Sequence, residues 1–412
     1  MMTDAINVLI IGAGPAGLSA ATELKRRGIA RVVMLEREDT AGGIPRHCGH
    51  PPFGFREFKR VLTGLKYAEK LVSTALKAGV EIQLSTTVVE AQADGKLLIS
   101  SDAGVEEITA QRVIYATGVR ETPRSARLVS GKRPLGIVNT GALQSMVYLH
   151  KRRPFKRPVI VGSELVSFSA IQTCRHAKIK PVAIIEASSS VIARWPTALF
   201  ARLMGVPVYL QTKIIRIKGD KKVSAVIIEN NNGEQQAIDC DGIIFSGSFM
   251  PEATLARSGH LLLDSGSGGP VVDQFGRCSD PVYFAAGNIL RPVETAGWSW
   301  NEGRQIGGWV ADDLEGVLTL TKCEINITSS DDLIKLYVPQ RIALPYNSNE
   351  GMENLQLRFS KMTRGELTIV SDKEVIWRKK LKVYPERRVL IPIKVFIHKN
   401  QNHQIELKFR EL

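Results

Sequence analysis

The sequence predicts an α/β fold with two domains built on parallel sheets, followed by an all-β domain. Three observations support this prediction. An apolar run at 8–11 stops at Gly12 and precedes a helical pattern, and a similar run at 158–161 stops at Gly162. Uninterrupted runs of this kind are typical of strands buried in a parallel sheet. After Leu320, short runs alternate apolar and polar residues between turn signals, which is typical of antiparallel β structure.

The composition is that of an ordinary globular protein. Of 412 residues, 44% are hydrophobic and 23% are charged, which is enough for two or three domains with substantial cores. No apolar run approaches the ~20 residues that span a bilayer, and no charged-then-apolar signal opens the chain. We therefore expect no transmembrane segment and a cytoplasmic location.

The cysteines predict a reducing environment. None of them forms a C-x-x-C pair, which argues against a disulfide framework, an iron–sulfur cluster and a structural zinc site. We therefore expect no bound metal. The five are Cys48, Cys174, Cys240, Cys278 and Cys323.

The net charge of +14 raises the question of a nucleic-acid partner. The excess is spread along the chain, with its densest run at 151–157. This run could bind nucleic acid, a cofactor phosphate or an acidic protein surface. We favour a solvated linker between domains, because Pro154 and Pro158 break any helix there. No nucleic-acid partner is expected.

The first buried strand is followed by a glycine turn typical of dinucleotide binding. Gly12 allows the tight bend, Gly14 lets a pyrophosphate approach the backbone, and Gly17 lets the helix expected at 15–27 pack on the strand. The free amide groups and the positive dipole of this helix face the phosphates. The residues expected to line the phosphates are Gly12, Ala13, Gly14, Pro15, Ala16 and Gly17.

An acidic residue closes the second strand of this unit. The strand is expected at 32–35, and Glu36 stands at its end, where a carboxylate binds both hydroxyls of an adenosine ribose and repels a 2′-phosphate. Arg37 follows, and Gly42 and Gly43 allow the backbone to turn close to a ligand. The spacing of strand, turn, helix, strand and acid predicts a dinucleotide site.

The next segments are expected to form a helix and a small antiparallel sheet. The apolar positions at 58–78 predict the helix. Strands are expected at 80–84, 86–91, 96–100 and 106–110.

A further buried strand at 113–115 ends in Ala116, Thr117 and Gly118. Coming after the first glycine turn, this motif resembles the flavoproteins with two dinucleotide-binding domains, which include disulfide reductases, NADH oxidases and amino-acid or opine dehydrogenase subunits. The resemblance covers roughly residues 5–318. It implies a glutathione-reductase-like fold with two Rossmann-like domains, and FAD at the first site with Ala116, Thr117 and Gly118 beside it.

The loop at 44–50 holds the candidate catalytic residues, whose role stays unknown. Disulfide reductases of the family use a Cys-x4-Cys pair, because a thiolate beside the flavin needs a second sulfur, and only Cys48 is present here. His47, Cys48 and His50 could ligate a metal, but further ligands are not evident. We favour a loop packed against the isoalloxazine, and a redox-active Cys48 stays open.

The second glycine turn is degenerate. The strand ending at Gly162 is followed by Glu164 and Ser167 where small residues are wanted, although Glu186 supplies the acid after the next strand. A carboxylate at Glu164 would repel a pyrophosphate. Two interpretations stay open: an NAD(H) site that uses Gly162 and Glu186, and a domain with a structural or different use.

The chain then returns to the first domain. The strand at 282–286 ends in Gly287 and Asn288, where the family usually has Gly-Asp, and Asn288 can still bond a ribityl hydroxyl. A helix expected at 301–314, preceded by Thr295, would direct its positive end at the flavin. Trp298 and Trp300 shield the flavin or pack in the core, and we favour packing.

Four segments are therefore expected: an FAD domain at 1–121 and 256–318, an inserted NAD(P)-binding-like domain at 122–255, and a β domain, expected to be a small sandwich used in docking or oligomerisation, at 319–412.

The resemblance implies an FAD-dependent oxidoreductase, most similar to the larger subunits of heteromeric amino-acid, opine or hydroxyproline dehydrogenases and of cyanide synthase. Its partners would be a small-molecule substrate and a protein subunit or a second copy. Two alternatives are a stand-alone NADH-dependent reductase or oxidase and a noncatalytic scaffold that retains FAD.

Overall fold

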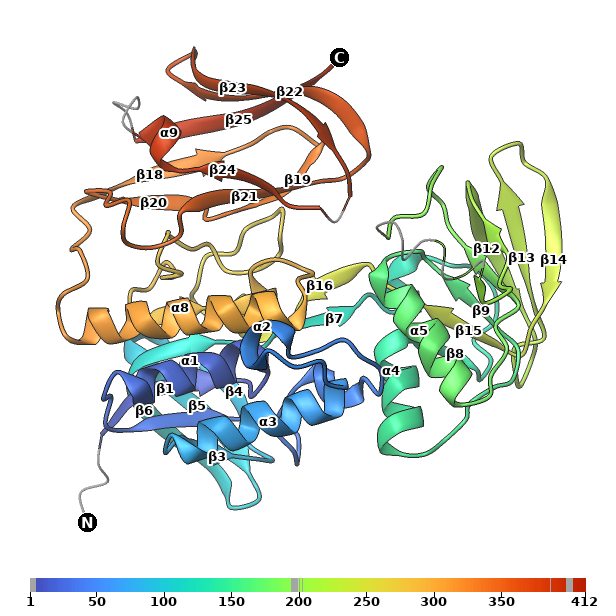
Figure 1. The fold of residues 1–412 in the computed structure, drawn as a ribbon, viewed down its shortest axis with the longest axis horizontal. Coiled ribbons are helices and arrows are strands. Elements are labelled where there is room, and N and C mark those ends of the chain that lie inside the picture. The colour runs from blue at the N-terminus through green and yellow to red at the C-terminus, as the bar shows by residue number, and fades with distance from the viewer. Residues whose placement is uncertain (1–4, 194–198, 200, 202, 386, 398–402) are drawn as a thin grey trace. The chain divides into compact units, whose positions relative to one another are not determined.

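The computed structural model describes residues 5–193, 199, 201, 203–385, 387–397 and 403–412. The chain packs into two compact units. One comprises Met1–Gly43, Ala68–Val119 and Pro251–Leu412, and the other comprises Ile44–Tyr67 and Arg120–Met250. Each unit holds one sheet of the dinucleotide-binding kind, and the first also holds the C-terminal β strands (Figure 1).

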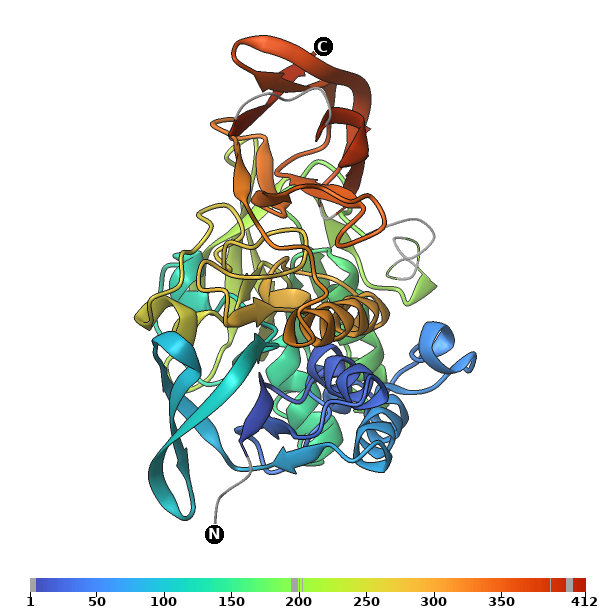
Figure 2. The same ribbon diagram turned by 90° about the vertical axis from the view of Figure 1, so that its left-hand side faces the viewer.

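A sheet in the order β3-β2-β1-β6-β5-β4, with β17 beside β6, organises the first unit. Its strands β1, β2, β3 and β17 and the second half of β6 run parallel, whereas β4, β5 and the first half of β6 are antiparallel. The antiparallel strands form the long cyan ribbons of Figure 2. The strands are β1 (Ile6–Ile11), β2 (Val32–Leu35), β3 (Glu81–Gln83), β4 (Thr87–Ala91), β5 (Lys96–Ser101), β6 (Gly104–Tyr115) and β17 (Tyr283–Ala285).

The strands expected at 106–110 and 113–115 are one strand, β6. Gln111 and Arg112 interrupt the apolar pattern without interrupting the strand, because the pairing partner changes there from β5 to β1 and β17. A single strand thus belongs to both the antiparallel ribbon and the parallel sheet.

Two predicted helices have different limits in the structure. The helix expected at 58–78 begins only at Gly64, as α3 (Gly64–Lys77). The short helix α2 (Phe55–Phe58) of the second unit precedes it and ends where Lys59 takes a left-handed φ of 53°. The helix expected at 301–314 is α8 (Ala296–Leu314), so Trp298 and Trp300 lie inside it. The other helices of the first unit are α1 (Pro15–Arg26) and α7 (Thr254–Ser258), with short 3-10 turns at η2 (Ala93–Gly95) and η5 (Gly287–Ile289).

The second unit has an all-parallel sheet in the order β11-β10-β9-β15-β8 and an antiparallel sheet β12-β13-β14. Its strands are β7 (Val119–Glu121), β8 (Ile137–Asn139), β9 (Pro158–Val161), β10 (Ala183–Ile185), β11 (Val208–Tyr209), β12 (Thr212–Lys218), β13 (Ala225–Asn230), β14 (Gln235–Asp239), β15 (Gly242–Phe245) and β16 (Phe249–Pro251), which pairs with β7. Its further helical segments are η1 (Ile44–His47), η3 (Arg124–Arg127), α4 (Thr140–Gln144), the π-helical turn η4 (Ser145–Leu149) and α5 (Leu165–His176).

The C-terminal strands form two sheets that enclose a shared apolar core. One sheet has the order β20-β18-β25-β22-β23 and the other β19-β21-β24. Their bounds are β18 (Cys323–Thr328), β19 (Ile334–Val338), β20 (Arg341–Leu344), β21 (Asn354–Phe359), β22 (Thr363–Ser371), β23 (Glu374–Val383), β24 (Val389–Pro392) and β25 (Gln404–Glu411), with the helical turn α9 (Lys394–Ile397) before β25. β23 lies at the edge of its sheet and is rich in lysine, as exposed edge strands often are.

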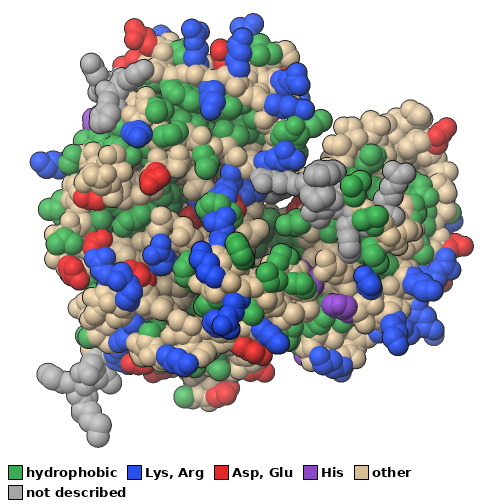
Figure 3. Space-filling model, viewed as in Figure 1, with side chains coloured by type: hydrophobic (Ala, Val, Ile, Leu, Met, Phe, Trp, Pro, Cys, Tyr) green, Lys and Arg blue, Asp and Glu red, His purple; other side chains and the backbone are tan. Residues whose placement is uncertain are grey.

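Figure 3 shows how lysine and arginine side chains are distributed on one face of the molecule. On the face drawn in Figure 3 the described residues show them singly or in small groups, with acidic side chains between them. A nucleic-acid backbone is usually bound by a continuous basic stripe or patch. On this face the described lysine and arginine side chains are therefore not gathered into one continuous patch.

Candidate functional site

The carboxyl ends of four strands coincide at one edge of the first sheet. Ile11 is in register with Leu35 and Tyr115, and Tyr115 with Ala285. Ligands of open α/β sheets bind at this edge. The segments predicted to contact FAD begin there: Gly12, Glu36, Ala116 and Gly287.

The glycine turn after β1 has both the tight packing and the open space that a dinucleotide needs. Gly12 has a φ of +102°, and a Cβ on it would lie 2.7 Å from the oxygen of Ala116. A Cβ on Gly17 would lie 2.2 Å from the oxygen of Gly12, so α1 can start against β1 only with glycine there. A Cβ on Gly14 would meet no heavy atom within 4 Å. Packing therefore requires Gly12 and Gly17, while Gly14 borders free space.

Glu36 is held against this turn. Its Oε2 accepts a hydrogen bond from the amide of Ala13 at 3.0 Å, and its Oε1 accepts one from the amide of Glu38 at 3.1 Å. Pro15 occupies the first turn of α1, where its missing N–H costs little. Arg37 is exposed. The acid expected to bind the ribose thus lies beside the turn expected to bind the phosphates.

The glycine pair after β2 closes on the same turn. The amide of Gly42 donates to the oxygen of Ala13 at 2.8 Å. Gly43 has a φ of +61°, and a Cβ on it would lie 2.8 Å from the Cα of Gly14. The close approach predicted for these glycines is therefore an approach to the first turn.

The end of β6 completes the floor of the site. The amide of Ala116 donates to the oxygen of Ile11 at 2.9 Å. Thr117 Oγ1 donates to the oxygen of Glu252 at 2.8 Å, and the amide of Glu252 donates to the oxygen of Gly118 at 2.9 Å. The hydroxyl of Thr117 therefore fixes the returning chain.

Helices α1 and α8 pack side by side and run parallel (Figure 1). A Cβ on Gly303 would lie 2.1 Å from the oxygen of Ala16, and one on Gly307 would lie 2.6 Å from the oxygen of Ala20. Because these contacts advance together, both helices begin at the same end. A Cβ on Gly287 would lie 2.7 Å from the Cβ of Ala16, so Gly287 joins this corner. The two helix dipoles therefore point their positive ends in the same direction.

The side chain of Asn288 is hydrogen-bonded to the loop that leads into α8. Its Oδ1 accepts from the amide of Glu294 at 2.7 Å, and its Nδ2 donates to the oxygen of Glu294 at 3.2 Å. An amide nitrogen carries two donors, so one N–H remains for a ligand. Thr295 precedes the first turn of α8, but its side chain makes no capping hydrogen bond.

A buried ion pair that the sequence pattern missed supports the same corner. Glu302 pairs with Arg291, and its Oε2 accepts from the amide of Gly287 at 2.8 Å. Among the described residues, Nε and Nη1 of Arg291 and Oγ of Ser299 are buried without a hydrogen-bond partner. Buried polar groups left in this way cost about 1–3 kcal/mol each. The spacing of Gly303 and Gly307 was the available signal that a close helix contact begins after Glu302.

These features fit FAD. The turn leaves space at Gly14, Glu36 presents its carboxylate at the sheet edge, and Arg291 and Ser299 carry buried donors that need acceptors. When bound, FAD supplies the hydride or electron-transfer chemistry. The residues of the chain would hold its phosphates at α1, its ribose at Glu36 and its far end near the start of α8.

The three candidate catalytic residues belong to the second unit. Burial raises the pKa of Cys48 to about 12, and its Sγ lies 3.7 Å from Gln144 Oε1. His50 Nε2 bonds Ser169 Oγ, and burial lowers the pKa of His50. His47 is half-buried. A thiol with such a pKa is not a thiolate nucleophile at neutral pH.

The turn after β9 reproduces the first site only at its start. Gly162 has a φ of +104°, and a Cβ on it would lie 2.7 Å from the oxygen of Ser246, as Gly12 relates to Ala116. Val161 is in register with Ile185 and Phe245, so this sheet also gathers its strand ends at one edge. The scaffold of a second nucleotide site is therefore intact.

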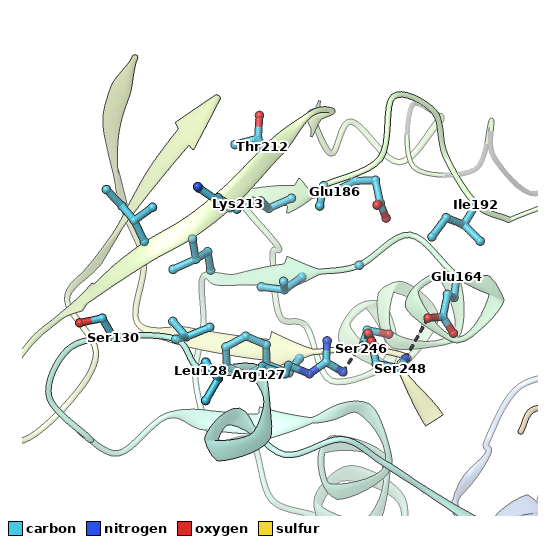
Figure 4. A pocket seen from close by; sticks show the side chains of 18 residues that line it. Arg127, Leu128, Ser130, Glu164, Glu186, Ile192, Thr212, Lys213, Ser246 and Ser248 are labelled. Atoms are coloured by element: carbon cyan, nitrogen blue, oxygen red, sulfur yellow. Dashed lines mark hydrogen bonds between the residues drawn. The ribbon is translucent and has the colours of Figure 1, made fainter. Parts of the chain in front are cut away.

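Glu164 occupies the position that corresponds to Gly14, and its carboxylate folds into the site. Its Oε1 accepts from the amide of Ser248 at 2.8 Å (Figure 4). A Cβ on Gly247 would lie 2.3 Å from Glu164 Cδ. Arg127 contacts the same strand end, donating to the oxygen of Gly247 at 2.6 Å. These residues do not fit a pyrophosphate, because a carboxylate already lies at the turn.

Glu186 keeps the position of a ribose-binding acid. Its Oε1 accepts from the amide of Ser188 at 2.8 Å, as Glu36 does from Glu38. Its Oε2 accepts from Ser163 Oγ at 2.5 Å, where Glu36 accepts from a backbone amide. The acid is thus buried against a hydroxyl of its own chain.

A cavity of about 540 Å³ lies at this edge of the second unit (Figure 4). The charged side chains that line it are Arg127, Glu164, Glu186 and Lys213. With two carboxylates and two cations, the cavity lining has no net positive charge, and a diphosphate binds best where there is one.

Two further findings concern only the part of the chain that the structure describes. No cluster of three or more His, Cys, Asp or Glu side chains is arranged to hold a metal ion. None of the helices has the length and apolar character to cross a bilayer.

Comparison with known proteins assigns the chain to a protein family. The model of the pyridine nucleotide-disulphide oxidoreductases matches residues 6–303. The sarcosine oxidase alpha subunit of Corynebacterium sp. (strain P-1) is 27% identical over 284 residues, which are 63% of this chain and 28% of that protein. The hydrogen cyanide synthase subunit HcnB of Pseudomonas aeruginosa is 22% identical over 335 residues, which are 74% of this chain and 69% of that protein.

Solved structures agree on the fold. T. acidophilum thioredoxin reductase superimposes with a TM-score of 0.62 at 22% identity, covering 75% of this chain and 98% of the reductase. At this identity the likeness concerns the two-domain α/β fold alone. The chain spans only about a quarter of the sarcosine oxidase alpha subunit that it matches.

Proposed function

This chain belongs to the pyridine nucleotide-disulphide oxidoreductase family, whose members bind FAD and act as oxidoreductases, and we propose that it is the flavin subunit of a heteromeric dehydrogenase for an amino acid, opine or related small amine. The observation that carries the proposal is Glu164, whose carboxylate lies at the second nucleotide turn. A protein that does not hold a pyridine nucleotide there needs another electron donor, and a partner subunit is that donor.

Two relatives support the heteromeric form. The matched sarcosine oxidase and hydrogen cyanide synthase proteins are both named as subunits. Sarcosine is an N-methylated amino acid, so at least one relative belongs to an enzyme of amine oxidation. The absence of a Cys-x4-Cys pair after Gly43 argues against disulfide reduction by this chain.

The roles of the chain's own residues follow from the site. Gly12, Gly14 and Gly17 admit the pyrophosphate to the start of α1. Glu36 binds the adenosine ribose, and Glu302 holds Arg291 near the start of α8. No catalytic acid or base is assigned, because the amine would be oxidised on the partner.

The test is reduction of the flavin by defined donors without oxygen. The FAD-loaded chain is mixed with its co-purifying partner and an amino-acid or opine panel, and bleaching of the flavin absorbance is followed. We expect bleaching only with partner and amine together. Bleaching by an amine without the partner, or none with any partner, would contradict the proposal.

A second candidate is a stand-alone NADH-dependent reductase or oxidase. Glu186 favours it, because this acid keeps its position at the end of β10 beside the cavity. Titration of the isolated FAD-loaded chain with NADH distinguishes the two, since rapid stoichiometric bleaching is expected only for the reductase.

A further inference from the structure

The C-terminal β domain reaches the loop that leads into α8. Two of its arginines make the contact: Arg358 on β21, and Arg388 just before β24. Arg358 Nη2 donates to the oxygen of Val293 at 2.7 Å and to Glu294 Oε1 at 2.5 Å. Arg388 Nε forms an ion pair with the same carboxylate oxygen at 3.4 Å. One carboxylate thus receives two cations from another domain.

The cluster is largely shielded from water. The side chains of Arg358 and Glu294 are 2% and 8% exposed, and that of Arg388 is 19% exposed. Charges in such a setting interact more strongly than surface pairs, and removing one partner leaves the other uncompensated. The contact is therefore a fixed part of the fold rather than a surface encounter.

Arg388 also covers a tryptophan of α8. Its guanidinium carbon lies 3.7 Å from the centre of the Trp298 ring, at the distance of a cation–π contact. Trp298 is in the first turn of α8 and precedes Ser299, whose buried hydroxyl has no partner among the described residues. Arg388 therefore touches both the loop and the helix end that it leads into.

The β domain is anchored on the FAD domain at a second place. Gln274 exchanges two hydrogen bonds with the backbone of Ala343, at 2.9 and 2.7 Å. Gln340 Oε1 accepts from the amide of Val272 at 3.0 Å, and the amide of Gln340 donates back to the oxygen of Val272 at 3.0 Å. These buried hydrogen bonds fix the β domain, which carries Arg358 and Arg388, against the FAD domain.

We propose that the C-terminal β domain is part of the flavin site, with Arg388 and Arg358 as positioning residues that hold the 288–298 loop and the first turn of α8. Glu294 is the link: its side chain binds the two arginines, and its backbone binds both polar atoms of the Asn288 side chain. Asn288 follows Gly287 at the sheet edge where FAD binds, so the arginines act on the cofactor through the loop. This inference rests on FAD binding and not on the identity of the electron donor.

The test measures FAD affinity and flavin midpoint potential in Arg388→Ala and Arg388→Lys. Arg378→Ala is the matched control, because Arg378 is exposed on β23 of the same domain. Loss of one cation–π contact and ion pair is expected to weaken FAD binding about five- to tenfold in Arg388→Ala. The potential should become more negative, because the positive end of α8 is no longer held against the reduced flavin. Arg388→Lys keeps the charge but not the planar contact, and should be intermediate.

Hydrogen exchange of the cofactor-free protein provides an independent readout. We expect faster exchange at 288–298 in Arg388→Ala and no change in Arg378→Ala. Wild-type FAD affinity and potential in Arg388→Ala would overturn the proposal, whether or not exchange at the loop rises. If Arg388→Ala does not fold, Arg388→Lys decides by the same measurements, and wild-type values for it would overturn the proposal.

Discussion

Glu164 Oε1 accepts a hydrogen bond from the amide of Ser248 at 2.8 Å, so the carboxylate spans from the turn after β9 to the segment after β15. The contact is possible because Gly247, the residue before Ser248, has no side chain. A Cβ on Gly247 would lie 2.3 Å from Glu164 Cδ. In the first unit the corresponding position is Gly14, beside open space. The second nucleotide turn is thus filled by the chain itself.

Replacing this side chain should open the second turn. In Glu164→Gly we expect NADH to bind at least about tenfold more tightly, a change of ~1.4 kcal/mol, because a repelling charge and its volume are both removed. Glu164→Gln removes only the charge and should gain less. Calorimetric titration of the FAD-loaded protein measures this, and unchanged affinity in both variants would mean that Glu164 is not the obstacle.

The first turn should separate folding from cofactor binding. Gly17→Ala places a Cβ 2.2 Å from the oxygen of Gly12 and is expected to lower the melting temperature of the cofactor-free protein. Gly14→Ala meets no atom within 4 Å, so the cofactor-free protein should melt as wild type but bind FAD at least about tenfold more weakly. Normal FAD affinity in Gly14→Ala would show that the pyrophosphate does not pass this position.

The local geometry of the first glycine turn could be predicted from the sequence. The turn from Gly12 to Gly17 and the acid Glu36 were predicted because each residue type answers a local requirement of space or charge. The end of α2 at Lys59 was not predicted, because the apolar pattern continues through 58–63 while the backbone turns left-handed.

Side-chain contacts set by the tertiary fold could not be predicted from the sequence pattern. Helical and strand periodicity predict none of three largely buried ion pairs of the first unit. These pairs join Arg291 to Glu302, and Arg358 and Arg388 to Glu294. Glu164 was recognised as a misfit, but its actual partner, the amide of Ser248, depends on how β9 and β15 align. The sequence pattern can identify a carboxylate that does not suit a phosphate site, but its hydrogen-bond partner is known only from the fold.

Cys48 should be unreactive at neutral pH. Burial raises its pKa to about 12, so the thiol stays protonated until the pH approaches that value, and the thiolate is the reactive form. Iodoacetamide at pH 7–8 should label the exposed Cys323 before Cys48, as mass spectrometry of peptides would show. Preferential labelling of Cys48 in the folded protein would restore it as a redox candidate.

Glu302 should be required for stability. In Glu302→Ala the guanidinium of Arg291 stays buried without its partner and the amide of Gly287 loses its acceptor, which should cost about 3–5 kcal/mol of unfolding free energy. Glu302→Gln keeps an acceptor for Gly287 but not the charge, so it should lose less stability.

Denaturant unfolding of the cofactor-free protein measures both Glu302 variants. The double variant Arg291→Met with Glu302→Gln supplies the control, because it removes both charges and should recover much of the loss. Equal destabilisation of the double variant and of Glu302→Ala would contradict an uncompensated arginine as the cause, and would instead assign the loss to the Gly287 hydrogen bond and to packing between α1 and α8.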